Sequence, residues 1–167
     1  MNAAYEQLLH VLDEREVGYQ SNEDSQSIRT DLRGEVGTFR IVAHVDEESE
    51  LFQVGGYLPI RAPKGCLPAI AEAVARANYG LRIGKFELDF NDGELRFQAS
   101  QILVYDVVGE EVIDRLIGTT MAMLDLYLPA FLSVIYGNEE PKDAIAYVEA
   151  GADRGEQTSA DEENGEE

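Results

Sequence analysis

The sequence predicts an α+β fold, in which an antiparallel sheet of about five strands is flanked by helices in the order α-β-β-β-α-β-β-α. Three segments place apolar residues at the i, i+3, i+4, i+7 spacing of amphipathic helices. Five shorter runs alternate apolar and polar residues, as half-buried strands do. The links between neighbouring strands are short and turn-like, which favours hairpins over parallel βαβ units.

The N-terminal half is predicted to hold one helix and three strands. Apolar residues from Tyr5 to Leu12 form the stripe of the helix, with Asn2 as its N-cap and Gly18 as the residue that ends it. Residues 21–27 are polar and predict a loop. The three strands that follow form an antiparallel meander over 28–33, 39–45 and 51–57.

The C-terminal half begins with a crossover that Pro59 and Pro63 make irregular. A second helix is expected from Pro68 to about Gly80, because proline suits the first turn of a helix. A hairpin with its turn at 91–93 follows. The core positions expected in the sheet are Phe39, Ile41, Phe52, Val54, Phe86, Leu88, Phe90, Leu95 and Phe97.

The longest helix, at about 110–136, carries more apolar residues than one buried face requires. Asp125 at mid-span and Pro129 argue against a membrane-spanning segment. The excess therefore predicts contact with a second subunit or a bound partner. The residues expected to form this surface are Met123, Leu126, Tyr127, Phe131 and Val134.

The crossover supplies a second candidate for exposed apolar contacts. It contains Tyr57, Leu58 and Ile60 in a segment where no regular strand is expected. A loop that covers the edge of the sheet would explain these three residues equally well. Both interpretations remain open from the sequence.

The charge excludes some classes of partner. The chain has 33 acidic and 13 basic residues, a formal charge of −20, and no run of Lys or Arg. Binding to nucleic acid or to an anionic membrane is therefore not expected. Apolar periodicity ends after a short helix that starts at Pro141, so we expect a folded domain at 1–149 and a disordered acidic tail at 150–167. Adaptation to high salt would also explain the acidity.

No catalytic constellation is recognisable in the sequence. His10 and His44 are the two imidazoles and Cys66 is the single thiol, and their spacing matches no metal site or catalytic motif. We expect no catalytic residue, no metal and no cofactor. One cysteine and an N-terminus without a signal peptide predict a cytoplasmic protein.

The stretch Asn78–Phe97 resembles the YbjN-domain family, which is described as bacterial sensory-transduction regulators. The matching features are Asn78, the run Gly84–Asp89 and the run Asp92–Leu95 with Phe97; Ile135–Gly137 and Pro141 also match. The resemblance implies a fold similar to type III secretion chaperones, which are small acidic proteins that commonly form homodimers and hold extended client segments. It carries no catalytic residues.

These observations predict a non-enzymatic, cytoplasmic protein-binding domain, either a chaperone-like protein or a regulatory adaptor, that binds a polypeptide through apolar surface as a homodimer. The alternative is a small-molecule or signal-sensing domain with a ligand cleft between the sheet and the helices. The identity of the client, the pathway and the stimulus cannot be derived from the sequence.

Overall fold

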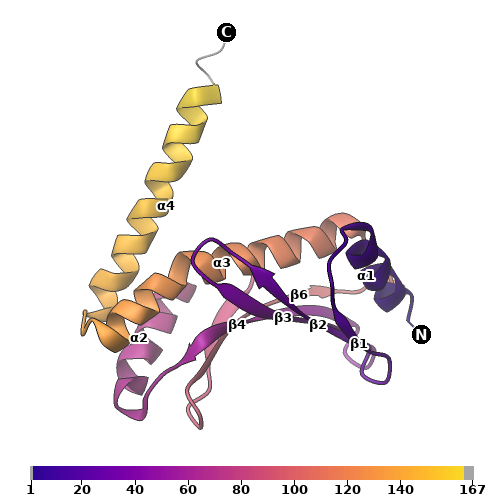
Figure 1. Ribbon diagram of the computed structural model, residues 1–167, viewed down its shortest axis with the longest axis horizontal. Coiled ribbons are helices and arrows are strands. Elements are labelled where there is room, and N and C mark those ends of the chain that lie inside the picture. The colour runs from indigo at the N-terminus through magenta and orange to yellow at the C-terminus, as the bar shows by residue number, and fades with distance from the viewer. Residues whose placement is uncertain (1, 164–167) are drawn as a thin grey trace.

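The computed structural model describes the backbone of residues 2–163 and the side chains of residues 2–153. It confirms the α+β class, with one antiparallel sheet and helices on one of its sides (Figure 1). The elements are α1 (Ala3–Glu14), β1 (Gln20–Asn22), β2 (Ser27–Arg33), β3 (Thr38–Asp46), β4 (Leu51–Arg61), the 3-10 turn η1 (Lys64–Cys66), α2 (Leu67–Asn78), β5 (Lys85–Leu88), β6 (Glu94–Ile102), α3 (Glu110–Tyr136) and α4 (Pro141–Glu163).

The sheet has six strands in the spatial order β1-β2-β3-β4-β6-β5, and each neighbouring pair is antiparallel. The meander and the C-terminal hairpin are joined where β4 pairs with β6, with Val54 opposite Ala99. The edge strand β1 replaces part of the loop predicted at 21–27. Its three residues are all exposed and pair with β2 through the backbone, so no apolar alternation marks them in the sequence.

Asn2 caps α1 as predicted, because its side-chain oxygen accepts a hydrogen bond of 2.8 Å from the amide of Ala4. The helix ends at Glu14, ahead of the predicted end at Gly18. Glu16 takes the left-handed conformation (φ 54°) and the amide of Val17 bonds back to the carbonyl of Leu12 at 2.9 Å. This local turn stops the helix before the glycine is reached.

The helix-facing side of the sheet forms the core against α1, α2 and α3. Seven of the nine core positions predicted for the sheet are buried there. Leu88 is only half-buried, and Phe90 is 59% exposed, which corrects the prediction. The reason is that β5 ends at Leu88, and a turn closed by the hydrogen bond from the Asp89 amide to the Glu94 carbonyl carries Phe90 out of the sheet.

The crossover predicted at Pro59 is the end of a longer strand instead. β4 runs through Pro59 to Arg61, and its register with β6 shifts between Tyr57 and Arg61. A shift of this kind leaves a residue out of the hydrogen-bond ladder, so the missing N–H of proline has no cost there. This irregularity explains why β4 continues through Pro59, although a proline predicts the end of a strand.

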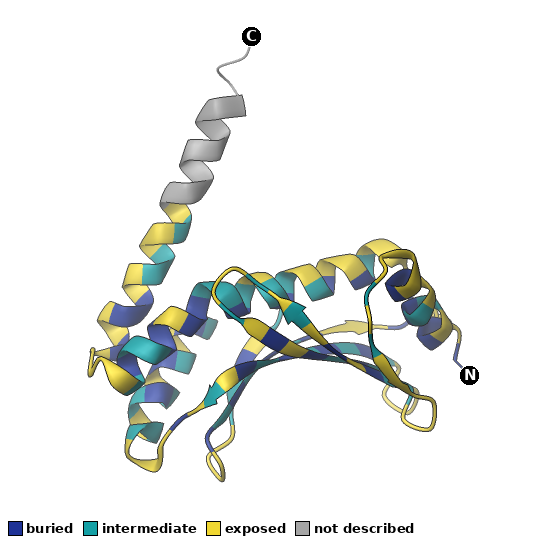
Figure 2. Ribbon diagram, in the orientation of Figure 1, coloured by how far each residue is buried: buried dark blue, intermediate teal, exposed yellow. Residues whose placement is uncertain are grey.

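Helix α4 begins at Pro141, as predicted, and continues to Glu163. The backbone of residues 150–163 is therefore helical where the sequence predicts disorder, while residues 164–167 lie outside the described part. No proline follows Pro141, so this stretch contains no residue that would break the helix. Figure 1 shows α4 leaving the body of the domain, and Figure 2 shows its buried residues near its start. The domain boundary at 149 stays a prediction.

Helix α3 lies unusually close to the middle of the sheet. A Cβ atom on Gly56 of β4 would stand 2.5 Å from Leu124 Cδ1 and 2.5 Å from Thr120 Cγ2. Both side chains are fully buried, so neither has free space to move into. The absence of a side chain at Gly56 is therefore what allows the helix to cross the sheet at this distance.

Gly56→Ala is expected to lower the free energy of unfolding by about 1–3 kcal/mol, because the added methyl group overpacks the contact between α3 and the sheet. The neighbouring Gly55 is the matched control, since its Cβ would meet nothing nearer than Tyr57 Cε2 at 3.7 Å. Urea denaturation of both variants measures the difference. Equal stability of the two variants would contradict the close approach.

Candidate functional site

The apolar surplus of α3 is covered largely by the same chain. The helix is long and apolar enough to cross a membrane by length and composition, but nine of its residues are buried against the sheet and the other helices. Tyr127, Phe131 and Val134, which were predicted to lie on a partner surface, belong to this buried set. Helices α2 and α4 of the same chain therefore cover part of the apolar surface of α3 that was predicted to contact a partner.

An aromatic cluster shows how this burial is achieved. The ring of Phe86 on β5 lies 5.0 Å from the ring of Phe97, 5.2 Å from Tyr127 and 5.3 Å from Phe131, measured between centroids. All three pairs are edge-to-face, an arrangement that aromatic rings favour. The cluster joins the edge strand to the C-terminal half of α3.

Met123 and Leu126, the other predicted residues on α3, are half-buried. Leu126 lines a hollow of about 510 Å³ between α3 and α4, which we call the α3–α4 groove. Tyr147, 75% exposed, and the exposed Pro129 stand at its sides. The groove is lined by Glu35, Ala122, Asp125, Leu126, Pro129, Tyr147, Val148, Gly151 and Ala152.

Asp125, the acidic residue in the apolar stretch of α3, has a structural partner. Its two carboxylate oxygens accept hydrogen bonds from the amides of Glu35 at 3.1 Å and Val36 at 3.0 Å, in the turn between β2 and β3. Gly34 allows the carboxylate this close to the turn, since its Cβ would lie 2.5 Å from Asp125 Oδ1. The wall of the α3–α4 groove at this end is therefore fixed by the sheet.

The first turns of α4 are held by Tyr127. Its hydroxyl donates a 2.8 Å hydrogen bond to Glu149 Oε1. Burial, together with the Glu149 carboxylate, raises the pKa of Tyr127 well above its usual value of 10.0. Because the folded state keeps the proton more tightly than the unfolded state, this contribution to stability is complete below pH 10 and is lost as the pH rises through the higher, folded-state pKa.

The three crossover residues lie near the end of β4, at or next to the shift of its register with β6. Leu58 is buried, whereas Tyr57 and Ile60 are half-buried, and all three line a hollow on the other side of the sheet from the helices. We call that other side, which carries no helix, the open face. The hollow has a volume of about 550 Å³ and is also lined by Arg29, Arg40, Val42, Pro59, Arg61 and Glu94.

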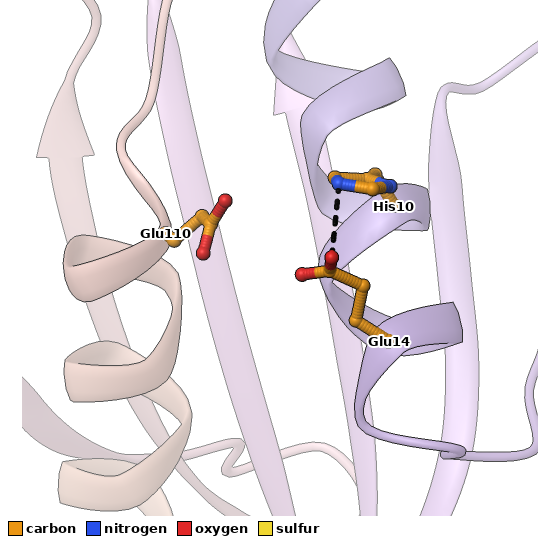
Figure 3. Close-up of side chains that lie close together, drawn as sticks. All are labelled: His10, Glu14 and Glu110. Carbon is orange, nitrogen blue, oxygen red and sulfur yellow. Dashed lines mark ion pairs between the residues drawn. The ribbon is translucent and has the colours of Figure 1, made fainter.

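His10, Glu14 and Glu110 could hold a metal ion by residue type (Figure 3). His10 Nε2 lies 3.5 Å from Glu14 Oε1, and one ligand atom of each residue lies within 4.8 Å of the others. All three are exposed; Gln7 donates to Glu110 Oε1 at 3.3 Å, and Arg15 lies 3.7 Å from Glu14. Contacts within the protein, and the preference for carboxylates at a helix N-terminus, account for this group.

The other two residues considered for chemistry lie on separate elements. His44 is half-buried on β3, and Cys66 is half-buried in the turn before α2. Within the described residues, neither hydrogen-bonds to the other or to His10. The structure therefore brings together no nucleophile–base pair from the residues that the sequence offers.

Sequence reasoning missed one exposed apolar segment, the loop between β6 and α3. Tyr105 is 92% exposed at its tip, and Tyr105 and Asp106 both have positive φ, which forms a tight turn closed from Val107 to Val104 at 3.3 Å. The run from Ile102 to Val108 is apolar, and its composition alone does not mark it as exposed. The turn instead directs Ile102, Val104 and Val107 into solvent.

The family model YbjN, with the description "Putative bacterial sensory transduction regulator", matches residues 4–133. Because this match covers most of the chain, the protein belongs to the YbjN family, as the resemblance at Asn78–Phe97 predicts. In the structure the side chain of Asn78 pairs with the backbone of Phe86 in both directions, at 2.7 and 3.0 Å. Asn78 thus pairs with backbone groups of Phe86 on the edge strand β5 that no neighbouring strand reaches.

Two solved structures are similar to the chain. The crystal structure of YbjN from E. coli, described as a putative transcription regulator, is 14% identical, with a TM-score of 0.55 over 72% of this chain and 85% of that one. The HopA1–SchA chaperone–effector complex contains a chain that is 18% identical, with a TM-score of 0.48 over 72% and 90%. No curated protein matches the chain. The likeness to E. coli YbjN shows a shared fold.

Tyr127→Phe is expected to loosen α4 without unfolding the domain, because it removes one hydrogen bond to a carboxylate and keeps the ring in the aromatic cluster. Hydrogen exchange of amides in residues 141–149 should become about fivefold to tenfold faster, as expected for the loss of a bond of about 1–1.5 kcal/mol. Tyr136→Phe is the control, since Tyr136 is 73% exposed. Unchanged exchange in the Tyr127 variant would mean that the hydroxyl does not hold α4.

Proposed function

We propose that this member of the YbjN family is a non-enzymatic, cytoplasmic adaptor that binds a polypeptide partner through apolar surface and acts as a homodimer. The observation that carries the proposal is the α3–α4 groove. It exposes apolar atoms of Leu126, Pro129 and Tyr147 in a chain of which 28% of the residues are charged. Exposed apolar surface in such a chain favours a contact with another protein.

The lining of the groove fits a macromolecular contact. Leu126 and Val148 are half-buried apolar residues of its lining, and Ala122, Gly151 and Ala152 are small residues that let another backbone come close. The carboxylate of Asp125 at this end already accepts hydrogen bonds from the turn between β2 and β3, so it does not need water or a partner to pair with it. A second copy of the chain or an apolar segment of a client would both bury this surface.

The family description supports a regulatory or adaptor role in general. The residues offered by the sequence for chemistry stand apart, which supports the non-enzymatic part of the proposal. A type III chaperone-like action on an extended client is the form of this role that the sequence resemblance implies.

The alternative, a small-molecule sensor with a cleft between the sheet and the helices, is less well supported. That layer is filled by fully buried side chains, among them Phe39, Phe52, Phe97 and Phe131. The hollows described above open instead on the open face and between α3 and α4. A ligand inside the core layer would have to displace these aromatic rings.

The dimer is tested first. Light scattering of the protein at micromolar concentration should give twice the 18.5 kDa mass of one chain. Leu126→Gln should weaken the dimer by about tenfold or more, because burying a leucine side chain contributes about 1.5–3 kcal/mol. Ile83→Gln, at a 41% exposed site in the loop before β5, is the control. A monomer mass for the natural sequence would remove the dimer from the proposal.

The partner is tested separately, by affinity capture from native lysate with the natural sequence, the Leu126→Gln variant and the Ile83→Gln variant as baits. We expect polypeptides that the natural bait and the Ile83 variant retain and the Leu126 variant loses. Melting curves verify that all three baits are folded. Retention that does not differ among the three baits would show that the α3–α4 groove is not the binding surface.

A further inference from the structure

The open face of the sheet has the opposite charge balance to the rest of the molecule. Six basic side chains point to this side, and they are Arg29, Arg33, Arg40, Arg61, Lys85 and Arg96. Four carboxylates accompany them, Asp31, Asp46, Glu87 and Glu94. The strand residues of this face are therefore net positive by two charges, or by one when Asp92 of the turn beside Arg61 is counted, whereas the whole chain carries −20. Nearly half of the basic residues lie on one side of one sheet.

The strand register arranges these residues in rows. One row crosses the sheet from Asp31 through Arg40, Tyr57 and Arg96 to Glu87, with each residue opposite the next. Tyr57 thus stands between two arginines in the middle of the face. Such cross-strand neighbours are close enough for their side chains to act on one ligand.

The adjacent row runs from Arg29 through Val42 and Gly55 to Gln98. Arg29 and Val42 of this row, with Arg40 and Tyr57 of the first row, line the hollow of about 550 Å³ described above, whose apolar floor includes Val42 and Tyr57. Arg29 and Arg40 are diagonal neighbours across β2 and β3 at its edge.

The arginines differ in how strongly they are already paired. Arg96 Nε donates to Glu87 Oε2 at 2.7 Å, and Arg61 pairs with Asp92 and Glu94. Arg40 lies 3.7 Å from Asp31, a long contact between two exposed side chains. Arg29 has no ion pair within the part of the chain that the structure describes. Arg29 and Arg40 are therefore available to bind the carboxylates of a ligand.

We propose that the open face binds an acidic, extended polypeptide segment, with Arg29 and Arg40 contacting its carboxylates and Tyr57 and Val42 contacting its apolar side chains. Charge complementarity identifies the partner as anionic, and the apolar floor favours a peptide over a simple anion. The four strands from β2 to β6 span about 14 Å, which matches about four extended residues. The strongly acidic remainder of the chain repels long polyanions, which argues against nucleic acid.

This inference rests on the proposed function in one respect, that the protein binds polypeptides. It specifies a site that is separate from the α3–α4 groove, on the side of the sheet that carries no helix. Either site can therefore be disabled while the other is kept. The Leu126→Gln variant should bind an acidic peptide on the open face as well as the natural sequence does.

The test is fluorescence anisotropy with a short labelled peptide in which glutamate and valine alternate. The Arg29→Gln/Arg40→Gln double variant should bind it about tenfold more weakly. Each exposed charge pair contributes up to about fivefold to the affinity, and the variant removes two. The Arg82→Gln/Arg115→Gln double variant is the matched control, because it removes the same charge from exposed sites off the sheet. Its affinity should change by less than about twofold.

Further measurements decide the inference. A peptide of alternating glutamine and valine should bind weakly, and added salt should lower the affinity for the acidic peptide. Equal loss in both double variants would overturn the proposal, because it would show a general charge effect. Binding of single-stranded RNA or of vesicles with anionic lipid as tightly as the acidic peptide would also overturn it. If the Leu126→Gln variant loses partners from lysate but keeps the peptide, the two sites are distinct.

Discussion

The direct contact between α3 and the middle of the sheet is the constraint on which the rest of the structure depends. It exists because Gly56 leaves room for Leu124 above β4. From this point the helix reaches other elements with successive side chains: Asp125 fixes the turn between β2 and β3, and Tyr127 packs on Phe86. Through its hydroxyl, Tyr127 also holds the start of α4. One helix therefore sets the positions of the edge strand, a hairpin turn and the C-terminal helix.

This arrangement gives the protein two unlike surfaces. All three helices that pack on the sheet lie on one side, so that side is largely closed by the core, and the α3–α4 groove is one place where it exposes apolar atoms. The open face carries half-buried Tyr57 and a surplus of arginine, in a chain that is acidic elsewhere. Because the sheet separates them, the two surfaces can contact a partner without competing for the same residues.

Elements whose side chains alternate or recur on one face were predictable, because periodicity reports burial directly. The strand β1 was not, since its exposed residues are held only by backbone hydrogen bonds, and neither was the end of β5, which a turn decides. Of the residues predicted for a partner surface, Leu126 and Tyr57 are half-buried, whereas Tyr127 and Phe131 are buried in the core. A sequence shows that a residue is apolar but does not show which neighbour will cover it.

The sequence by itself determined the α+β class, the order of the longer helices and strands and the acidity, because these follow from local pattern and composition, and its motif at 78–97 indicated the family. The tertiary structure decided how the apolar surplus of α3 is divided between α2, α4 and solvent. It also decided that arginines scattered from position 29 to position 96 share one face. Both depend on strand register and on the distance between layers, which are set by contacts between residues far apart in the chain.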